Sequence, residues 1–165
     1  MIRAAIITVS DSVARGTRED RSGQKVRELA ESLNWAVTIV EVVADERDQI
    51  AAKLKHLADS GTISIILTTG GTGIALRDVT PEATRSVIDR EIPGLAELMR
   101  TRGLEFTPRA ALSRAVAGTR GPVLIVNLPG SPKGAVESLD AIVELVPHVL
   151  ELLRGQTEHA VSRQE

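Results

Sequence analysis

The chain has 165 residues, of which 42% are hydrophobic and 25% charged, and its formal net charge is −2. This size and balance suit one compact domain with a sizeable core and a solvated surface. One Phe, one Trp and no Tyr disfavour a protein that stacks bases on aromatic side chains, and the slight negative charge gives no field that attracts nucleic acid or anionic lipid. The lack of Cys excludes disulfides and thiolate metal sites. We therefore expect no nucleic acid as a partner.

The N-terminal nine residues are apolar but short, and they lack the basic region, long apolar run and cleavage site of a signal peptide. No window reaches about 18 consecutive apolar residues, the length that a membrane-spanning helix needs. We therefore expect a cytoplasmic protein with no membrane as a partner.

Four short runs of apolar and β-branched residues predict strands. Each run is nearly continuous rather than alternating, which is typical of strands buried on both faces. The four runs are Ala4–Val9, Val37–Val43, Ser64–Thr69 and Val123–Leu128.

Helical periodicity separates these strands. Apolar residues recur at helical spacing over residues 26–33, 50–58 and 139–153, and Gly155 suits the end of the last helix. Alternation of strands and helices favours right-handed crossovers and a mostly parallel sheet covered by helices on both faces. We expect an α/β fold with one domain over residues 1–155 and a polar, frayed tail over residues 156–165.

The pattern is less regular between Thr80 and Val123. Thr84–Ile88 and Gly94–Arg102 are predicted as helices, and Ala111–Ala117 is our candidate for an extra strand at the sheet edge.

Polar, acidic or glycine-rich residues follow every predicted strand. Ligands of open parallel sheets bind beyond the carboxyl ends of the strands, so we expect these residues to gather in one site. In chain order they are Ser10 and Asp11, then Asp45, then Gly70, Gly71, Thr72 and Gly73 with Asp78 and Thr80 close behind, and finally Pro129, Gly130 and Ser131.

Gly70–Gly73 contains three glycines directly after a strand, so backbone N–H groups could approach a phosphate or another anion closely. The alternative is a tight turn from strand to helix. The segment matches neither GxGxxG nor a phosphate-binding P-loop, which disfavours dinucleotide binding and Walker-type hydrolysis.

Thr80-Pro81 and Ser131-Pro132 each resemble an N-cap followed by Pro in the first helical turn. Free N–H groups at such helix starts attract anions, although two well-capped helices would give the same pattern. The cluster of Arg15, Arg18 and Arg21 could contact phosphates, with a solvated loop as the alternative.

Asp45 and Asp78 are the candidate ligands of Mg²⁺, an ion that prefers oxygen and bridges phosphates. The alternative is that each carboxylate caps a helix. That alternative is stronger for Asp45, because a helical pattern begins at Glu46.

Taken in order, these segments resemble the MogA/MoaB family of molybdenum cofactor biosynthesis proteins, which is related to the G domain of gephyrin and of its plant counterpart. The resemblance runs from about Ile6 to about Leu153. Its carriers are Thr8–Asp11 with Gly16, Asp20 and Gly23, then Val43–Glu46, Thr68–Gly73, Arg77–Thr84 and Asn127–Lys133.

The resemblance implies a three-layer α/β/α fold and the Mg²⁺-dependent transfer of AMP from ATP to molybdopterin, with release of pyrophosphate. It places Asp45 and Asp78 at the important acidic positions, Gly70–Gly73 at the glycine-rich loop, and Ser131 in a loop that helps to bind pterin or phosphate. On this basis we expect Ser10, Asp11 and Ser131 to line the pocket. The rival interpretation is a non-catalytic pterin-binding or scaffold protein of the same pathway.

The family resemblance also implies a homo-oligomer, either a trimer or a dimer of trimers. Leu95, Leu98 and Met99 share one helical face, and Leu104 and Phe106 follow outside the four-strand core. An apolar set of this kind is typical of an interface. The alternative is that these side chains pack back onto the sheet edge.

Overall fold

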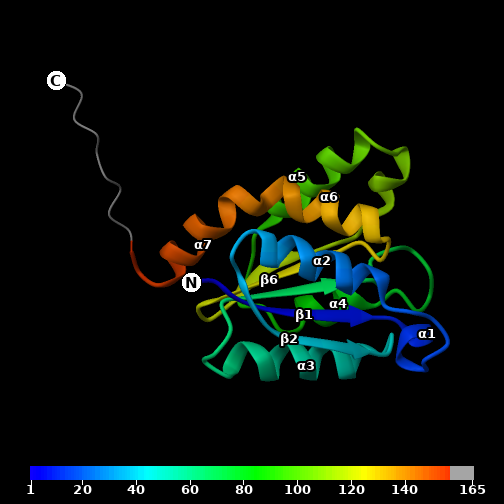
Figure 1. Cartoon of the computed structure of the whole chain (residues 1–165), viewed down its shortest axis with the longest axis horizontal. Helices are drawn as coiled ribbons and strands as arrows, with labels where there is room; N and C mark the ends of the chain where they lie inside the picture. The colour runs from blue at the N-terminus through cyan, green and yellow to red at the C-terminus, as the bar shows by residue number, and fades with distance from the viewer. Residues whose placement is uncertain (157–165) are drawn as a thin grey trace.

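A computed structural model describes residues 1–156 of the chain (Figure 1). These residues form a six-stranded sheet in the order β2-β1-β3-β6-β5-β4. The first four strands in this order run parallel, and the last two are antiparallel to their neighbours. Their bounds are β1 Arg3–Val9, β2 Ala36–Val43, β3 Ile65–Thr69, β4 Arg90–Glu91, β5 Ala117–Arg120 and β6 Val123–Leu128. The predicted α/β fold with a mostly parallel sheet is confirmed.

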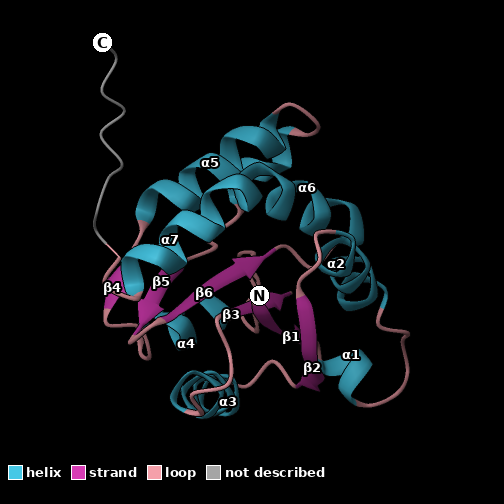
Figure 2. Cartoon of the chain, turned by 60° about the vertical axis from the view of Figure 1, so that its left-hand side comes forward, coloured by secondary structure: helices cyan, strands magenta, loops and turns pink. Residues whose placement is uncertain are grey.

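Helices cover both faces of the sheet, which gives three layers (Figure 2). One face carries α2 (Arg21–Ser32), α5 (Pro93–Leu104), α6 (Pro132–Ile142) and α7 (Val146–Leu153), and the other carries α3 (Arg47–Asp59) and α4 (Thr80–Arg85). Three short turns complete the fold: α1 (Asp11–Ala14), η1 (Pro108–Leu112) and η2 (Val143–Leu145). No helix within residues 1–156 has the length and apolar character to cross a membrane.

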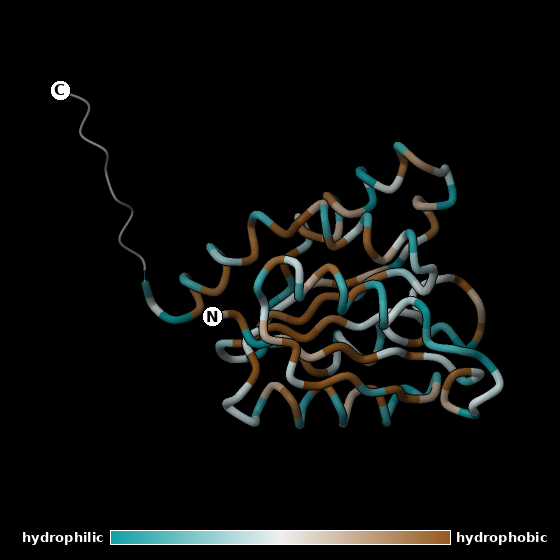
Figure 3. The backbone as a smooth tube through the Cα atoms, in the orientation of Figure 1, coloured by the Kyte–Doolittle hydropathy of each residue, from teal (hydrophilic) through white to brown (hydrophobic). Residues whose placement is uncertain are grey.

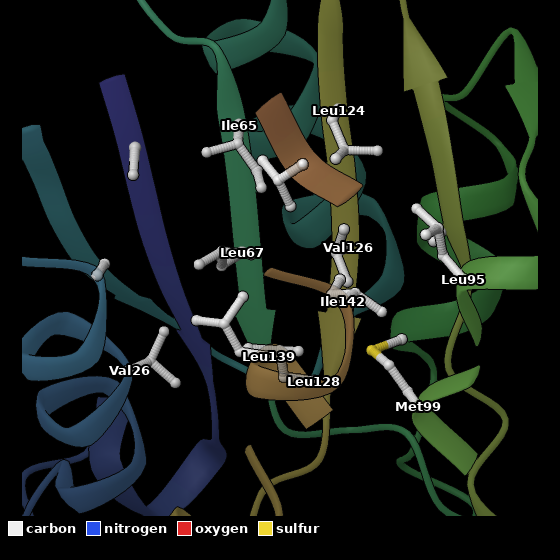
Figure 4. Close-up of a cluster of buried hydrophobic side chains, with 14 of the residues drawn as sticks. Val26, Ile65, Leu67, Leu95, Met99, Leu124, Val126, Leu128, Leu139 and Ile142 are labelled. Carbon is white, nitrogen blue, oxygen red and sulfur yellow. The ribbon is translucent and has the colours of Figure 1, made fainter. Parts of the chain in front are cut away.

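The larger core is almost entirely aliphatic. Side chains of β3 and β6 meet Val26 of α2, Leu139 of α6 and Met99 of α5 between the sheet and the helices (Figure 4). The apolar stretches of the chain coincide with the central strands (Figure 3). The smaller core lies under α3 and α4 on the other face. Burial of this apolar surface is the main force that holds the layers together.

Asn127 is a fully buried polar residue within this apolar interior. Its amide group donates to the hydroxyls of Thr68 at 3.0 Å and Thr84 at 2.9 Å, and its oxygen accepts from the backbone of Val116 at 3.1 Å. The amide thus joins β3, α4 and β6 at the end of the sheet where the predicted site lies, with its polar groups satisfied.

Three expectations about the elements were wrong. The extra strand expected at Ala111–Ala117 is β5 at Ala117–Arg120, because residues 108–112 form the η1 turn and residues 113–116 are irregular, and β5 is not the sheet edge but lies between β6 and the edge strand β4. The second strand is not buried on both faces, because β2 is the edge of the sheet and exposes Val40 and Val42. The single helix expected over residues 139–153 is divided by η2 into α6 and α7.

The helix that begins at Thr80 ends at Arg85, earlier than Thr84–Ile88 predicted, and α5 extends slightly beyond Gly94–Arg102. Gly155 adopts the left-handed conformation expected after the last helix, with φ of 78°. Of the tail predicted over residues 156–165, residues 157–165 lie outside the described part of the chain.

Candidate functional site

The loops that follow β1, β2, β3 and β6 meet beyond the carboxyl ends of these strands, as the parallel topology predicts. The backbone of Gly70 donates to Leu128 O at 3.1 Å, and the hydroxyl of Thr69 donates to Pro129 O at 2.7 Å. The backbone of Ser10 donates to Val43 O at 3.0 Å. These bonds place the candidate residues of all four loops side by side.

The glycine-rich loop passes so close to its neighbours that side chains would not fit. Gly70 and Gly71 have φ of 105° and 67°, which L-residues rarely adopt. A Cβ on Gly70 would collide with the carbonyl of Val9, and one on Gly71 would collide with the hydroxyl of Thr80 and lie 3.2 Å from Asp45 Oδ1. Within residues 1–156, the N–H groups of Gly71, Thr72 and Gly73 donate no hydrogen bond, which leaves them available to an anion.

Thr80 does not cap its helix, which corrects one expectation. Val79 is the N-cap of α4, and Thr80 is the first helical residue. The Thr80 side chain is fully buried and donates to Gly70 O at 2.9 Å, while its backbone donates to Gly71 O at 3.1 Å. Thr80 therefore supports the glycine loop from behind. Ser131 is the N-cap of α6, as predicted, and accepts from Gly134 N at 3.1 Å.

Asp11 and Asp45 form a reciprocal pair at the ends of β1 and β2. The backbone N–H of Asp11 donates to Asp45 Oδ2 at 2.8 Å, and that of Asp45 donates to Asp11 Oδ1 at 3.0 Å. Burial raises the pKa of the Asp45 carboxyl, and the nearby charges of Asp11 and Asp78 raise it further. The alternative that Asp45 caps α3 does not hold, because Glu46 is the N-cap residue and that helix has no side-chain cap.

Arg77 ties the segment after the glycine loop to this pair. Its guanidinium donates to Asp11 at 2.6 and 3.1 Å and to Glu46 Oε1 at 2.8 Å. The hydrogen bond from Arg77 is the main reason that the pKa of Asp11 lies below its ordinary value. With both oxygens engaged, Asp11 holds Asp45 and Arg77 in place.

Arg114 fixes the other side of the same loop. Its backbone donates to Thr72 O at 2.8 Å, and its guanidinium donates to Gly73 O and Asp78 O, each at 2.7 Å. It also forms an ion pair with Glu82, and this contact keeps the pKa of that carboxyl below its ordinary value. Nothing local in the sequence marks Arg114, because its side-chain partners lie 32 to 41 residues away.

Two cavities lie at the carboxyl ends of the strands, on opposite sides of a wall that they share. The first, of about 350 Å³, is polar and is lined by residues of the β1–α2 segment, among them Ser10, Arg18 and Asp20, and by Asp45 and Thr69. The second, of about 360 Å³, is more apolar and lies between α5, η1 and α6. The shared wall consists of the residues that border both cavities: Gly71, Asp78, Gly130 and Ser131.

The sequence-predicted residues fall into four groups around this wall. Besides the shared four, Ser10, Asp45 and Gly70 line the polar cavity, and Thr72, Gly73 and Pro129 line the apolar one. Asp11 and Thr80 line neither cavity and lie behind the loops that do.

Sequence reasoning missed most of the apolar cavity. Arg100, Arg109 and Glu137 line it, together with the apolar side chains of Met99 and Ala115.

The apolar face of α5 belongs in part to the core. Met99 is 3% exposed and packs on the sheet, as does Leu95, so the prediction that they form an interface was wrong and the alternative holds for these two residues. Leu98, Leu104 and Phe106 remain exposed.

Within residues 1–156, no cluster of three or more His, Cys, Asp or Glu side chains can hold a metal by itself. Asp45 and Asp78 are close enough for their charges to interact. In the described chain, Asp45 Oδ1 and Asp78 Oδ1 accept no hydrogen bond, so each carboxylate has an oxygen free for a ligand. Two carboxylates completed by substrate phosphates are a usual set for Mg²⁺, and the residues fit that ion.

Comparison with known families identifies the family of this chain. The model of the probable molybdopterin binding domain matches residues 5–148. The chain belongs to this family. The match spans both cavities and all the candidate residues, and it confirms the resemblance drawn from the sequence.

Individual relatives cover nearly the whole chain. The molybdopterin adenylyltransferase of Helicobacter pylori J99 is 42% identical over 156 residues, which cover 93% of this chain and 89% of the relative. The enzyme of the same name from Escherichia coli K12 is 37% identical over 171 residues, covering 93% and 86%. Among solved structures, the molybdopterin biosynthesis enzyme MoaB of Thermus thermophilus matches with a TM-score of 0.88 and 54% identity, covering 94% of this chain and 98% of that one.

Proposed function

We propose that this protein transfers AMP from ATP to the terminal phosphate of molybdopterin in molybdenum cofactor biosynthesis. The relatives named molybdopterin adenylyltransferase at 37–42% identity support this activity. The structural observation that carries the proposal is the pair of cavities that share one wall, beside backbone N–H groups that donate no hydrogen bond within residues 1–156. Such a site suits a reaction that joins two ring-bearing phosphates.

The wall is where the phosphates of both substrates would meet. Two features of this wall would attract anions: the free N–H groups of the glycine loop and the N-terminus of α6, which Ser131 caps. The polar cavity would take ATP, with Arg18 and Arg21 near its phosphates, and the apolar cavity would take the pterin ring. The adenine and pterin rings would then lie on opposite sides of the wall, with the reacting phosphates between them.

The chemistry needs no protein nucleophile. An oxygen of the molybdopterin phosphate attacks the α-phosphorus of ATP, a new phosphorus–oxygen bond forms, and the bond to the β-phosphate oxygen breaks to release pyrophosphate. The protein positions the two phosphates and stabilises the developing charge. Asp45 and Asp78 would hold Mg²⁺, which would neutralise the charge of the phosphates.

The direct test is release of pyrophosphate from ATP, Mg²⁺ and molybdopterin by the purified protein. The proposal predicts stoichiometric pyrophosphate and adenylylated molybdopterin, and no pyrophosphate without molybdopterin. Binding of molybdopterin without any pyrophosphate would favour the non-catalytic pterin-binding interpretation.

We also propose that the chain assembles as a trimer or a dimer of trimers. Exposed apolar side chains on and after α5 support an interface: Leu98, Leu104 and Phe106 are 38%, 51% and 49% exposed.

A further inference from the structure

Glu137 lies on α6, lines the apolar cavity, and has a side chain only 16% exposed. Its Oε1 is buried and accepts no hydrogen bond within residues 1–156. Lys133 Nζ lies 3.8 Å from this oxygen, within reach of an ion pair but beyond a hydrogen bond, and the Lys133 side chain is 81% exposed. A buried carboxylate oxygen without a donor is costly, so the fold leaves Glu137 in need of a partner.

The surroundings of Glu137 suit a flat ring. Ala96, Met99, Ala110 and Ala115 give the cavity apolar walls. A carboxylate in such a place accepts hydrogen bonds and donates none. One N–H donor would satisfy Oε1, and two adjacent N–H donors on one ring edge would pair with both oxygens of the carboxylate.

The two rings of the proposed reaction differ in this respect. A pterin presents its N3–H and its 2-amino group side by side, which matches two carboxylate oxygens. Adenine presents the acceptor N1 beside its 6-amino group, so a carboxylate would face a lone pair. Sites built for such hydrogen bonds reject analogues that leave a buried polar group unpaired.

We propose that Glu137 is a specificity residue that accepts hydrogen bonds from the N3–H and 2-amino group of the pterin ring and thereby assigns the apolar cavity to molybdopterin rather than to ATP. This inference rests on the proposed function for the identity of the two substrates. It explains why a carboxylate with a buried oxygen lines a cavity that must also admit the anionic tail of the ligand: the carboxylate would contact the ring, and the shared wall would contact the phosphate.

The test compares two fluorescent probes near neutral pH, pterin-6-carboxylate and lumazine-6-carboxylate. Lumazine has a carbonyl in place of the 2-amino group and would set an oxygen against the carboxylate. We expect the wild-type protein to bind the pterin about 10- to 100-fold more tightly, the range for loss of one paired recognition contact. Glu137→Gln should abolish this preference, because its amide can donate to the lumazine carbonyl and accept from N3–H.

Asp140→Asn is the matched control, since Asp140 is an exposed acid on the same helix and lines neither cavity. It should keep the wild-type preference, and thermal melting of all three proteins checks that they are folded. Equal binding of the two probes by the wild type, or an unchanged preference in Glu137→Gln, would overturn the assignment. So would a rise in KM for ATP in the variant with KM for molybdopterin unchanged. Probe binding does not require turnover, so absence of pyrophosphate would contradict adenylyl transfer and leave the ring assignment standing.

Discussion

Asp11 and Asp45 exchange hydrogen bonds, each backbone N–H donating to the other's carboxylate at 2.8 and 3.0 Å. The pair joins the ends of two parallel strands and leaves Asp45 Oδ1 on the side of the glycine loop, 3.2 Å from where a Cβ on Gly71 would lie. The Asp11 N–H therefore holds the Asp45 carboxylate in place through a hydrogen bond that the amide side chain of Asn could also accept.

Asp45→Asn should lose activity while gaining stability at neutral pH. Because the pKa of Asp45 is raised, its ionised form is less favourable in the folded than in the unfolded chain. The stability linked to this group is complete below its unfolded pKa and is lost as the pH rises through its folded pKa. Asn cannot ionise and still offers an oxygen to Asp11 N–H. We expect the variant to melt at a higher temperature than the wild type at pH 7, with the gain shrinking as the pH falls toward about 4. A variant that melts lower at pH 7 would contradict this account.

Asp78→Asn should keep the fold and lose most adenylyl transfer. Asp78 borders both cavities, and its Oδ2 accepts from the backbone of Ala75 at 3.0 Å, a bond that Asn can retain. Loss of one well-placed electrostatic group costs a rate factor of about 100 or more. Pyrophosphate release by the purified variant measures the effect. Near-normal turnover would remove Asp78 from the catalytic set.

Gly71→Ala should weaken ATP and molybdopterin binding, and Gly16→Ala is its control. Both glycines have positive φ, 67° and 75°, so both variants share the backbone penalty of roughly 1–2 kcal/mol. A Cβ on Gly16 has no atom within 4 Å, whereas one on Gly71 would collide with the Thr80 hydroxyl and displace the glycine loop next to Asp45. Calorimetric titration should show lost affinity for Gly71→Ala alone. Equal affinity in the two variants would mean that the loop serves only as a turn.

Arg114→Lys should impair turnover by misplacing Asp78 and the glycine loop. Lys cannot make the forked contacts to Gly73 O, Asp78 O and Glu82 at once. Since a displacement of about 1 Å can cost about 100-fold in rate, we expect kcat to fall by about tenfold or more. Arg27→Lys, a surface pair on α2, is the control and should be active. If kcat is unchanged, the contacts of Arg114 do not position the site.

The oligomer should depend on the exposed apolar residues on and after α5, Leu98, Leu104 and Phe106. Light scattering of the wild type at micromolar concentration should give three or six times 17.6 kDa. Leu104→Glu places a charge in the proposed interface and should lower this mass. Val40→Glu, at the opposite edge of the sheet, should leave it unchanged. A wild-type mass near 17.6 kDa would refute assembly, and a stable dimer would refute the trimeric count.

The convergence of the site could be predicted because parallel strands bring their carboxyl ends to one edge, whatever the details of packing. The position of β5 could not, since Gly118, Thr119 and Arg120 lack the apolar run that marks a buried strand. The burial of Leu95 and Met99 could not be predicted either, because an apolar helical face has the same sequence pattern whether it packs on a sheet or on a partner subunit. Glu137 gave no signal, since a single acid on a helix usually faces solvent.

The shared wall between the cavities divides the lining residues into separate sets. Arg18 and Asp20 belong only to the polar cavity, and Arg109 and Glu137 only to the apolar one. A change in either set can alter the affinity for one ring and leave the other ring's surroundings untouched. A substitution in the shared wall alters the lining of both cavities at once. This holds for Gly71, Asp78, Gly130 and Ser131. The preferences for the two proposed substrates can thus change independently during evolution, whereas a substitution at any of these four positions alters the surroundings of both.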